Sequence, residues 1–112
     1  MSTPQPGKPV RGSTTGRPIM ALLDLLGRRW VLRILWELRD DALGFRELQA
    51  RCDGMSSSVL AARLGDMTAA AIVAKDGDEH YALTDEGRAL LGALGGLNDW
   101  AERWARRMTD VD

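Results

Sequence analysis

The chain has 112 residues, which is enough for one domain, and its 15 basic and 16 acidic residues give a net charge of −1. A single cysteine excludes an internal disulfide, and the absence of any run of about 18 apolar residues excludes a membrane-spanning helix. Residues 1–17 are rich in proline, glycine and hydroxyl side chains, and they bury too little apolar surface to order themselves. We therefore expect a flexible tail over 1–17, not a signal peptide, and one folded cytoplasmic domain over 18–112.

The positive charge is concentrated in the tail. Lys8, Arg11 and Arg17 lie there without any acidic residue, whereas the remaining chain has 12 basic and 16 acidic residues. Proteins that bind nucleic acid usually have a basic surface. Nucleic-acid binding by this domain would therefore require positive charge gathered locally, or it would be weak.

Two helices are predicted at the start of the domain. Residues 18–26 place Ile19, Leu22, Leu23 and Leu26 at helical spacing. Gly27 interrupts this pattern, and a second helix is predicted over 28–39. Apolar residues cover most of its circumference, so we expect it to be the central buried helix; they are Trp30, Val31, Leu32, Ile34, Leu35, Trp36 and Leu38.

A helix, a turn and a second helix are predicted next. Residues 42–43 form a brief strand and 45–51 a short helix, and Asp53-Gly54 is a typical turn pair. Ser56 or Ser57 caps the following helix, which runs to about residue 70, because a serine hydroxyl accepts from an unpaired first-turn amide. Its inward stripe has apolar residues at i, i+4 and i+7, namely Leu60, Leu64 and Met67.

A hairpin and a long helix complete the domain. Two short strands over 72–75 and 80–83 are joined by a turn that contains Asp76-Gly77. Thr84 caps a helix that extends to about residue 107. Three glycines within it, Gly92, Gly95 and Gly96, indicate either close packing of another helix or a local kink.

This order of elements is the layout of a winged helix-turn-helix, a mainly α fold with a small β-hairpin. In that fold the second helix of the pair enters the major groove of DNA. The sequence also contains four tryptophans, more large apolar surface than a domain of about 95 residues needs for its own core, which favours dimerisation. They are Trp30, Trp36, Trp100 and Trp104.

Five segments resemble the HxlR-type winged helix-turn-helix transcriptional regulators, relatives of the MarR and PadR groups, over about residues 20–108. They are LLGRRWVLRILWEL at 25–38, GFREL at 44–48, MSSSVLAARL at 55–64, YALTDEGRAL at 81–90 and NDWAERW at 98–104. The resemblance implies a homodimer formed by the N- and C-terminal helices, with two recognition helices reading a pseudo-palindromic operator in double-stranded DNA. It also implies a transcriptional regulator, expected here to be a repressor, that responds to a small molecule or an oxidant.

The chain departs from these relatives in three places. The wing is short and acidic, with Asp76, Asp78 and Glu79 where relatives have basic residues, and such charges repel DNA phosphates. Gly65 replaces a long polar residue in the recognition helix. Ala71 replaces the glycine that usually precedes the first wing strand.

The candidate DNA-binding residues lie mainly on the recognition helix. At about 100° per residue, Ser58, Ala61, Ala62 and Gly65 point away from its buried stripe. None can make a bidentate contact with a base, so we expect modest direct readout supported by DNA shape. Contacts to phosphates are expected mainly from arginine and serine, with solvated surface residues as the alternative interpretation. The candidate set is Arg46, Ser56, Ser57, Ser58, Ala61, Ala62, Arg63 and Lys75, with Arg51 as a weaker candidate.

The tryptophans are the best candidates for contact with a ligand. Trp100 and Trp104 lie four residues apart on one helical face, and a dimer could bring Leu22 and Leu97 near them. These four residues form either a pocket for a planar hydrophobic small molecule or plain dimer core.

Residues with catalytic or metal-binding chemistry are isolated in this sequence. Relatives that sense oxidants usually place the cysteine near the first helix, whereas Cys52 lies in the predicted turn, so we expect an inert thiol. His80 has no partner for a zinc site, and Asp85 and Glu86 are explained by helix capping. We therefore expect no enzyme activity, metal or cofactor.

Two other functions stay open. One is a ligand-binding winged-helix dimer that has lost tight DNA binding, which the acidic wing favours. The other is a winged-helix module for protein interactions.

Overall fold

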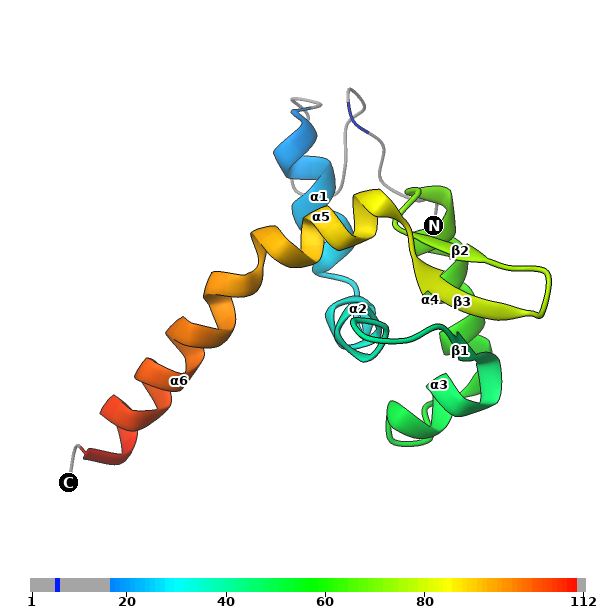
Figure 1. Cartoon of the computed structure of the whole chain (residues 1–112). Coiled ribbons are helices and arrows are strands. Elements are labelled where there is room, and N and C mark those ends of the chain that lie inside the picture. The colour runs from blue at the N-terminus through cyan, green and yellow to red at the C-terminus, as the bar shows by residue number, and fades with distance from the viewer. Residues whose placement is uncertain (1–5, 7–16, 111–112) are drawn as a thin grey trace.

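The computed structural model describes Pro6 and residues 17–110, so most of the predicted tail lies outside the described residues. Figure 1 shows a helical body, a small sheet, and a last helix that extends away from the body. The elements in chain order are α1 (Pro18–Leu26), α2 (Val31–Glu37), β1 (Leu43–Gly44), α3 (Phe45–Arg51), α4 (Ser57–Ala69), β2 (Val73–Lys75), β3 (His80–Leu83), α5 (Asp85–Ala93) and α6 (Gly95–Asp110). The predicted fold class, mainly α with a small β-hairpin, is confirmed.

The sheet has three antiparallel strands in the order β1-β3-β2. The hairpin pairs Val73 with Leu83 and Lys75 with Tyr81, as expected for the wing. The brief strand β1 adds to the other edge of β3, where Gly44 lies opposite His80. The sheet therefore ties the start of α3 to the wing.

The core forms between α2 and α4. Ile34 on α2 and Leu60 and Met67 on α4 have no exposed surface, so the predicted inward stripe of the recognition helix is confirmed. Helix α2 contributes the buried Ile34 to this core, as expected for the central helix, but its burial is incomplete, because Leu32 is 46% exposed and Trp36 is 44% exposed. One edge of this helix thus presents apolar surface to solvent.

Helix α2 also begins later than predicted. Residues 28–30 form a turn, and Trp30 precedes the helix with φ of +80°, a left-handed conformation that a helix cannot include. The helix therefore begins at Val31, three residues after the predicted start.

The end of α4 has the hydrogen bonds of a Schellman motif. The Ile72 amide donates to the Met67 carbonyl at 2.9 Å, and the Ala71 amide donates to the Thr68 carbonyl at 3.0 Å. Ala71 lies between them with φ of +63°. Ile72 completes this cap, which is why β2 begins at Val73 and not at the predicted residue 72.

The long C-terminal helix is interrupted. Thr84 caps α5 as predicted, since its hydroxyl accepts from the Gly87 amide at 3.0 Å. The helix stops at Ala93, and α6 begins at Gly95, so one continuous helix is a wrong prediction. The break agrees with the kink interpretation of the glycines, whereas close packing by a helix of a second copy stays a prediction. No atom of the described chain lies within 4 Å of an added Cβ at Gly95 or Gly96.

Helix α6 has no buried side chain over residues 95–109, the part whose side chains the structure describes. Every residue from 95 to 109 is exposed, including Leu97, Trp100, Trp104 and Met108. Its apolar residues lie on one face at helical spacing. Within the described residues, no helix is both long enough and apolar enough to cross a membrane.

Candidate nucleic-acid interface

Side chains hold the turn between α3 and α4 in place. The Gln49 side-chain amide donates to the Met55 carbonyl at 2.8 Å and lies 3.0 Å from Ser57 Oγ. From α2, Arg33 donates to the Arg51 carbonyl at 2.7 Å. These bonds fix the start of α4 relative to α3 and α2.

The outer face of α4 is flat and exposed. Ser58, Ala61, Ala62 and Gly65 are exposed, as the helical spacing predicts. Nothing lies within 4 Å of an added Cβ at Gly65. This face can approach a groove closely, but its side chains offer little hydrogen bonding to bases.

The serine hydroxyls at the start of α4 contact other groups of the same chain. Ser56 is the N-cap, and its hydroxyl accepts from the Val59 amide at 3.2 Å. The hydroxyls of Ser56 and Ser58 are 3.4 Å apart, and that of Ser57 contacts Gln49. Because these hydroxyls are engaged within the fold, the groups at this end of α4 that are free of intrahelical partners are first-turn amides, the kind of group that can bind an anion.

The basic candidates differ in their surroundings. Arg46, on α3, is exposed. Arg51 lies 3.6 Å from Glu47, and Lys75 lies 3.7 Å from Glu79. These two pairs are surface ion pairs, which water and salt weaken.

Arg63 points into the body of the domain. Its Nε donates to the Arg29 carbonyl at 2.9 Å, and its NH1 contacts Asp66 Oδ2 at 3.0 Å. The same carboxylate oxygen lies 3.1 Å from Arg28, which in turn lies 3.5 Å from Asp24.

These four charged side chains, Asp24, Arg28, Arg63 and Asp66, form an α1–α4 ion cluster. Arg28 is 8% exposed, and the two carboxylates are 12–15% exposed. The sequence pattern did not indicate this cluster. Its only local signals were the i, i+4 spacing of Asp24 and Arg28 and the i, i+3 spacing of Arg63 and Asp66.

The wing tip carries fixed negative charge. The backbone amides of His80 and Asp78 donate to Asp76 Oδ1 at 3.0 Å and 2.8 Å. These hydrogen bonds, with that from His80 the stronger cause, lower the pKa of the Asp76 carboxyl, so it is ionised near neutral pH. This charge disfavours contact between the wing and phosphates.

Cys52 and His80, the residues considered for redox or metal chemistry, have no partner for such chemistry among the described residues. Cys52 has no exposed surface, and burial raises the pKa of its thiol despite the nearby Arg33. His80 lies exposed in β3. Among the described residues, no cluster of His, Cys, Asp and Glu side chains could hold a metal ion.

The predicted dimer or ligand residues lie on separate surfaces of one chain. Trp100 and Trp104 stack on α6, with ring centroids 5.7 Å apart and planes 15° apart. They border a hollow of about 310 Å³ together with Arg103 and Arg107.

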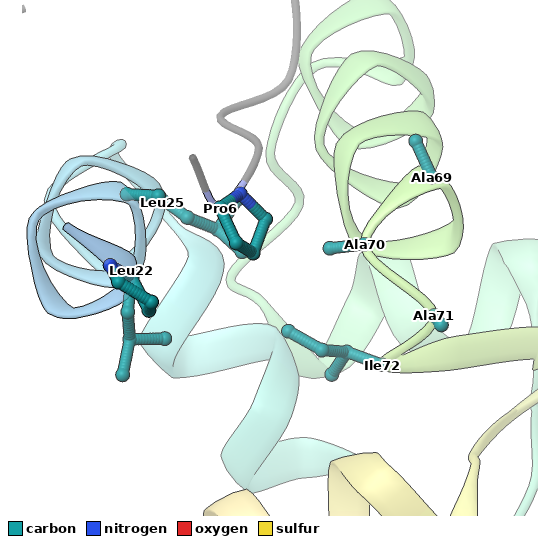
Figure 2. A pocket seen from close by; sticks show the side chains of 9 residues that line it. Pro6, Leu22, Leu25, Ala69, Ala70, Ala71 and Ile72 are labelled. Atoms are coloured by element: carbon teal, nitrogen blue, oxygen red, sulfur yellow. The ribbon is translucent and has the colours of Figure 1, made fainter. Parts of the chain in front are cut away.

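Leu22 instead lines a cavity of about 360 Å³ between α1 and the junction of α4 with β2 (Figure 2). Pro6 lies over this cavity, and the side chains that line it are apolar. A single chain therefore does not bring Leu22 together with the tryptophans of α6.

Comparisons with known proteins agree with this architecture. A family profile described as HxlR-like helix-turn-helix matches residues 25–109. The "uncharacterized HTH-type transcriptional regulator YvaP" of Bacillus subtilis (strain 168) is 33% identical over 88 residues, covering 73% of this chain and 82% of YvaP.

Two crystal structures are also similar. Quinone-bound YodB from B. subtilis is 31% identical with a TM-score of 0.70, covering 77% of this chain and 97% of YodB. A "possible HxlR family transcriptional factor" from Thermoplasma volcanium GSS1 is 26% identical with a TM-score of 0.68, covering 80% of this chain and 85% of its own. The chain thus belongs to the HxlR-like helix-turn-helix family of transcriptional regulators.

Proposed function

We propose that this regulator is a homodimer that binds a pseudo-palindromic operator and represses transcription by occluding a promoter. The observation that carries the proposal is the exposed outer face of α4, on a helix that the turn bonds and its cap fix in the fold. A recognition helix in a major groove needs this combination of a free face and a fixed orientation. The exposed apolar face of α6 supports the proposal that a second copy of the chain packs against it.

The proposed DNA contacts divide by chemistry. Arg46 and the first-turn amides of α4, with Ser56, Ser57 and Ser58, bind phosphates, and Lys75 adds a weaker contact from the wing. Ala61 and Ala62 approach thymine methyl groups. Because no side chain on this face makes a bidentate base contact, DNA shape supplies much of the specificity.

A fluorescence anisotropy titration tests this function. The probe is a labelled duplex from the region upstream of the protein's own gene, with a scrambled duplex of equal composition as the control. We expect saturable binding of the first duplex, with a log affinity that falls against log salt with a slope of about −2 to −4, because each protomer offers only one or two cations. Equal affinity for both duplexes, or no saturable binding at low salt, would contradict the proposal.

A second candidate function is recognition of a planar hydrophobic compound at Leu97, Trp100 and Trp104. It is supported by the stacked indoles with two arginines beside them, and by the similarity to a structure described as quinone-bound. Quenching of tryptophan fluorescence by planar aromatics that is lost in Trp104→Leu tests it. Quenching without any DNA binding would favour the ligand-binding dimer over the regulator.

A further inference from the structure

We infer that Arg63 is a positioning residue, which anchors the recognition helix to the Arg29 carbonyl, holds the Asp66 carboxylate that contacts Arg28, and does not bind DNA phosphates. The inference rests on the proposed operator binding. It assigns to the α1–α4 ion cluster the task of setting the angle between the recognition helix and α1.

The guanidinium of Arg63 bridges two fixed acceptors. Nε donates to the Arg29 carbonyl at 2.9 Å, and NH1 contacts Asp66 Oδ2 at 3.0 Å. The side chain is only 25% exposed. To reach a phosphate, it would have to give up both the Arg29 carbonyl and a carboxylate that is 12% exposed, which would leave Asp66 with Arg28 as its remaining cationic neighbour. The planar fork of arginine fits this bridge, whereas a lysine ammonium cannot make both contacts in the same geometry.

The cluster joins the two helices that matter for operator geometry. Asp66 on α4 contacts Arg28 at 3.1 Å, and Arg28 contacts Asp24 on α1 at 3.5 Å. The cluster has two positive and two negative charges, so its charges balance. If α1 lies at the dimer interface, this connection sets the orientation of each recognition helix relative to the twofold axis, and hence the half-site spacing.

DNA binding by this protein depends strongly on the orientation of the recognition helix α4. The outer face of α4 ends in small side chains, so it cannot correct a misplaced helix through strong base contacts.

Two substitutions distinguish a positioning role of Arg63 from a phosphate contact, because the two roles predict different changes in DNA affinity. R63K keeps the charge and loses the fork, so a phosphate contact would survive it while the bridge would not. D66N removes a negative charge and releases Arg63, so it would tighten DNA binding if Arg63 served as a phosphate ligand. Positioning predicts that both variants bind more weakly.

The experiment uses a duplex that the wild-type protein selects from a random-sequence library, with anisotropy measured at several salt concentrations. For R63K and D66N we expect affinity to fall about tenfold or more, with a salt slope equal to that of the wild type. We also expect both variants to discriminate less among duplexes whose half-site spacing is changed by about one base pair. Far-UV circular dichroism and thermal melting check that each variant is folded.

Arg46 supplies the matched control, because it is an exposed arginine on the neighbouring helix. Since the proposed function places Arg46 at a phosphate, R46A is expected to make the slope shallower by about two for a dimer, whereas R63A is expected to leave the slope unchanged. The inference is overturned if R63K binds like the wild type, if D66N binds more tightly, or if R63A makes the slope shallower as R46A does. If R63K fails to fold, the direction of the D66N effect decides. If the wild type selects no duplex, the proposed function itself fails.

Discussion

Ala71 occupies a backbone conformation that favours glycine. Its φ of +63° closes the cap of α4, and a left-handed conformation costs an alanine roughly 1–2 kcal/mol. A glycine, which the resemblance leads one to expect here, would adopt this conformation without strain.

Replacing Ala71 by glycine is expected to stabilise the protein by about 1 kcal/mol, because the strain at this residue is removed. Urea unfolding at a fixed protein concentration measures the change. Ala70→Gly is the matched control, since Ala70 has a right-handed conformation, and it should destabilise by up to about 1 kcal/mol. Equal effects of the two substitutions would argue against strain at Ala71.

Cys52 shows how burial decides thiol chemistry. Its thiol has no exposed surface, and its raised pKa leaves less thiolate near neutral pH than an ordinary cysteine has. We expect alkylation by iodoacetamide at pH 8 to be at least about tenfold slower in the native protein than in urea. Equally fast alkylation in both states would show that the site opens readily and would restore Cys52 as a candidate sensor.

For some residues the sequence predicts which face of a helix they occupy, whereas for others it does not predict the contacts they make. Helical spacing alone put Ser58, Ala61 and Ala62 on the outer face of α4. The hydrogen bond from Arg63 to the Arg29 carbonyl could not be predicted from the sequence. Arg29 lies 34 residues away, and the pattern of side chains carries no information about which backbone carbonyl accepts a bond.

Element α5 is fixed against β2 by a close backbone approach. The Thr84 amide donates to the Ile72 carbonyl at 2.9 Å, and the Thr84 hydroxyl donates to the Ala71 carbonyl at 2.6 Å. A methyl group on Gly87 would overlap the Ile72 carbonyl. The residues Thr84 and Gly87 of the segment YALTDEGRAL therefore hold the start of α5 against the residues that precede β2.

Gly87→Ala is expected to destabilise the protein by about 2–3 kcal/mol, because the overlapping atom belongs to backbone that cannot turn away. Chemical denaturation measures the loss. Gly65→Ala serves as the control, because that helical position is open, and it should stabilise by about 1 kcal/mol. A neutral Gly87→Ala would mean that α5 shifts on the sheet at little cost.

The short central elements followed their sequence signals closely. Helix α3 and strand β3 have the predicted bounds, and α4 and β2 differ from prediction by about one residue, because caps and turn residues mark their ends. The start of α2 was missed, and the break at Leu94 was anticipated only as one of two interpretations of the nearby glycines. In both places the apolar pattern continues across the end of a helix, and hydrophobic spacing does not report backbone dihedral angles.

At the scale of the whole molecule, exposed apolar residues lie on α1, α2 and α6. The large ones are Ile19, Leu23, Leu32, Trp36, Leu97, Trp100, Trp104 and Met108. Residues of α2, α5 and α6 also line a groove of about 230 Å³ with mostly apolar side chains. The four tryptophans are explained in part by this surface, since two of them lie on α6 and one lies on the exposed edge of α2.

A variant with both Trp100→Ser and Trp104→Ser is expected to be monomeric at concentrations where the wild type is a dimer, because the apolar face of α6 is lost. Sedimentation equilibrium measures the mass. Glu102→Ser with Arg106→Ser is the matched control on the other face of the helix, and it should leave the dimer intact. A monomeric wild type would refute the assembly on which operator binding is proposed.

The exposed length of α6 has one further consequence. A 16-residue helix whose side chains from 95 to 109 are all exposed is close to the length at which isolated helices in water are only marginally stable. Its order would then come from the second protomer, so dilution below the dissociation constant would unwind this arm while the core stayed folded. The amount of protein in the cell would thus set the fraction of chains that carry an ordered arm.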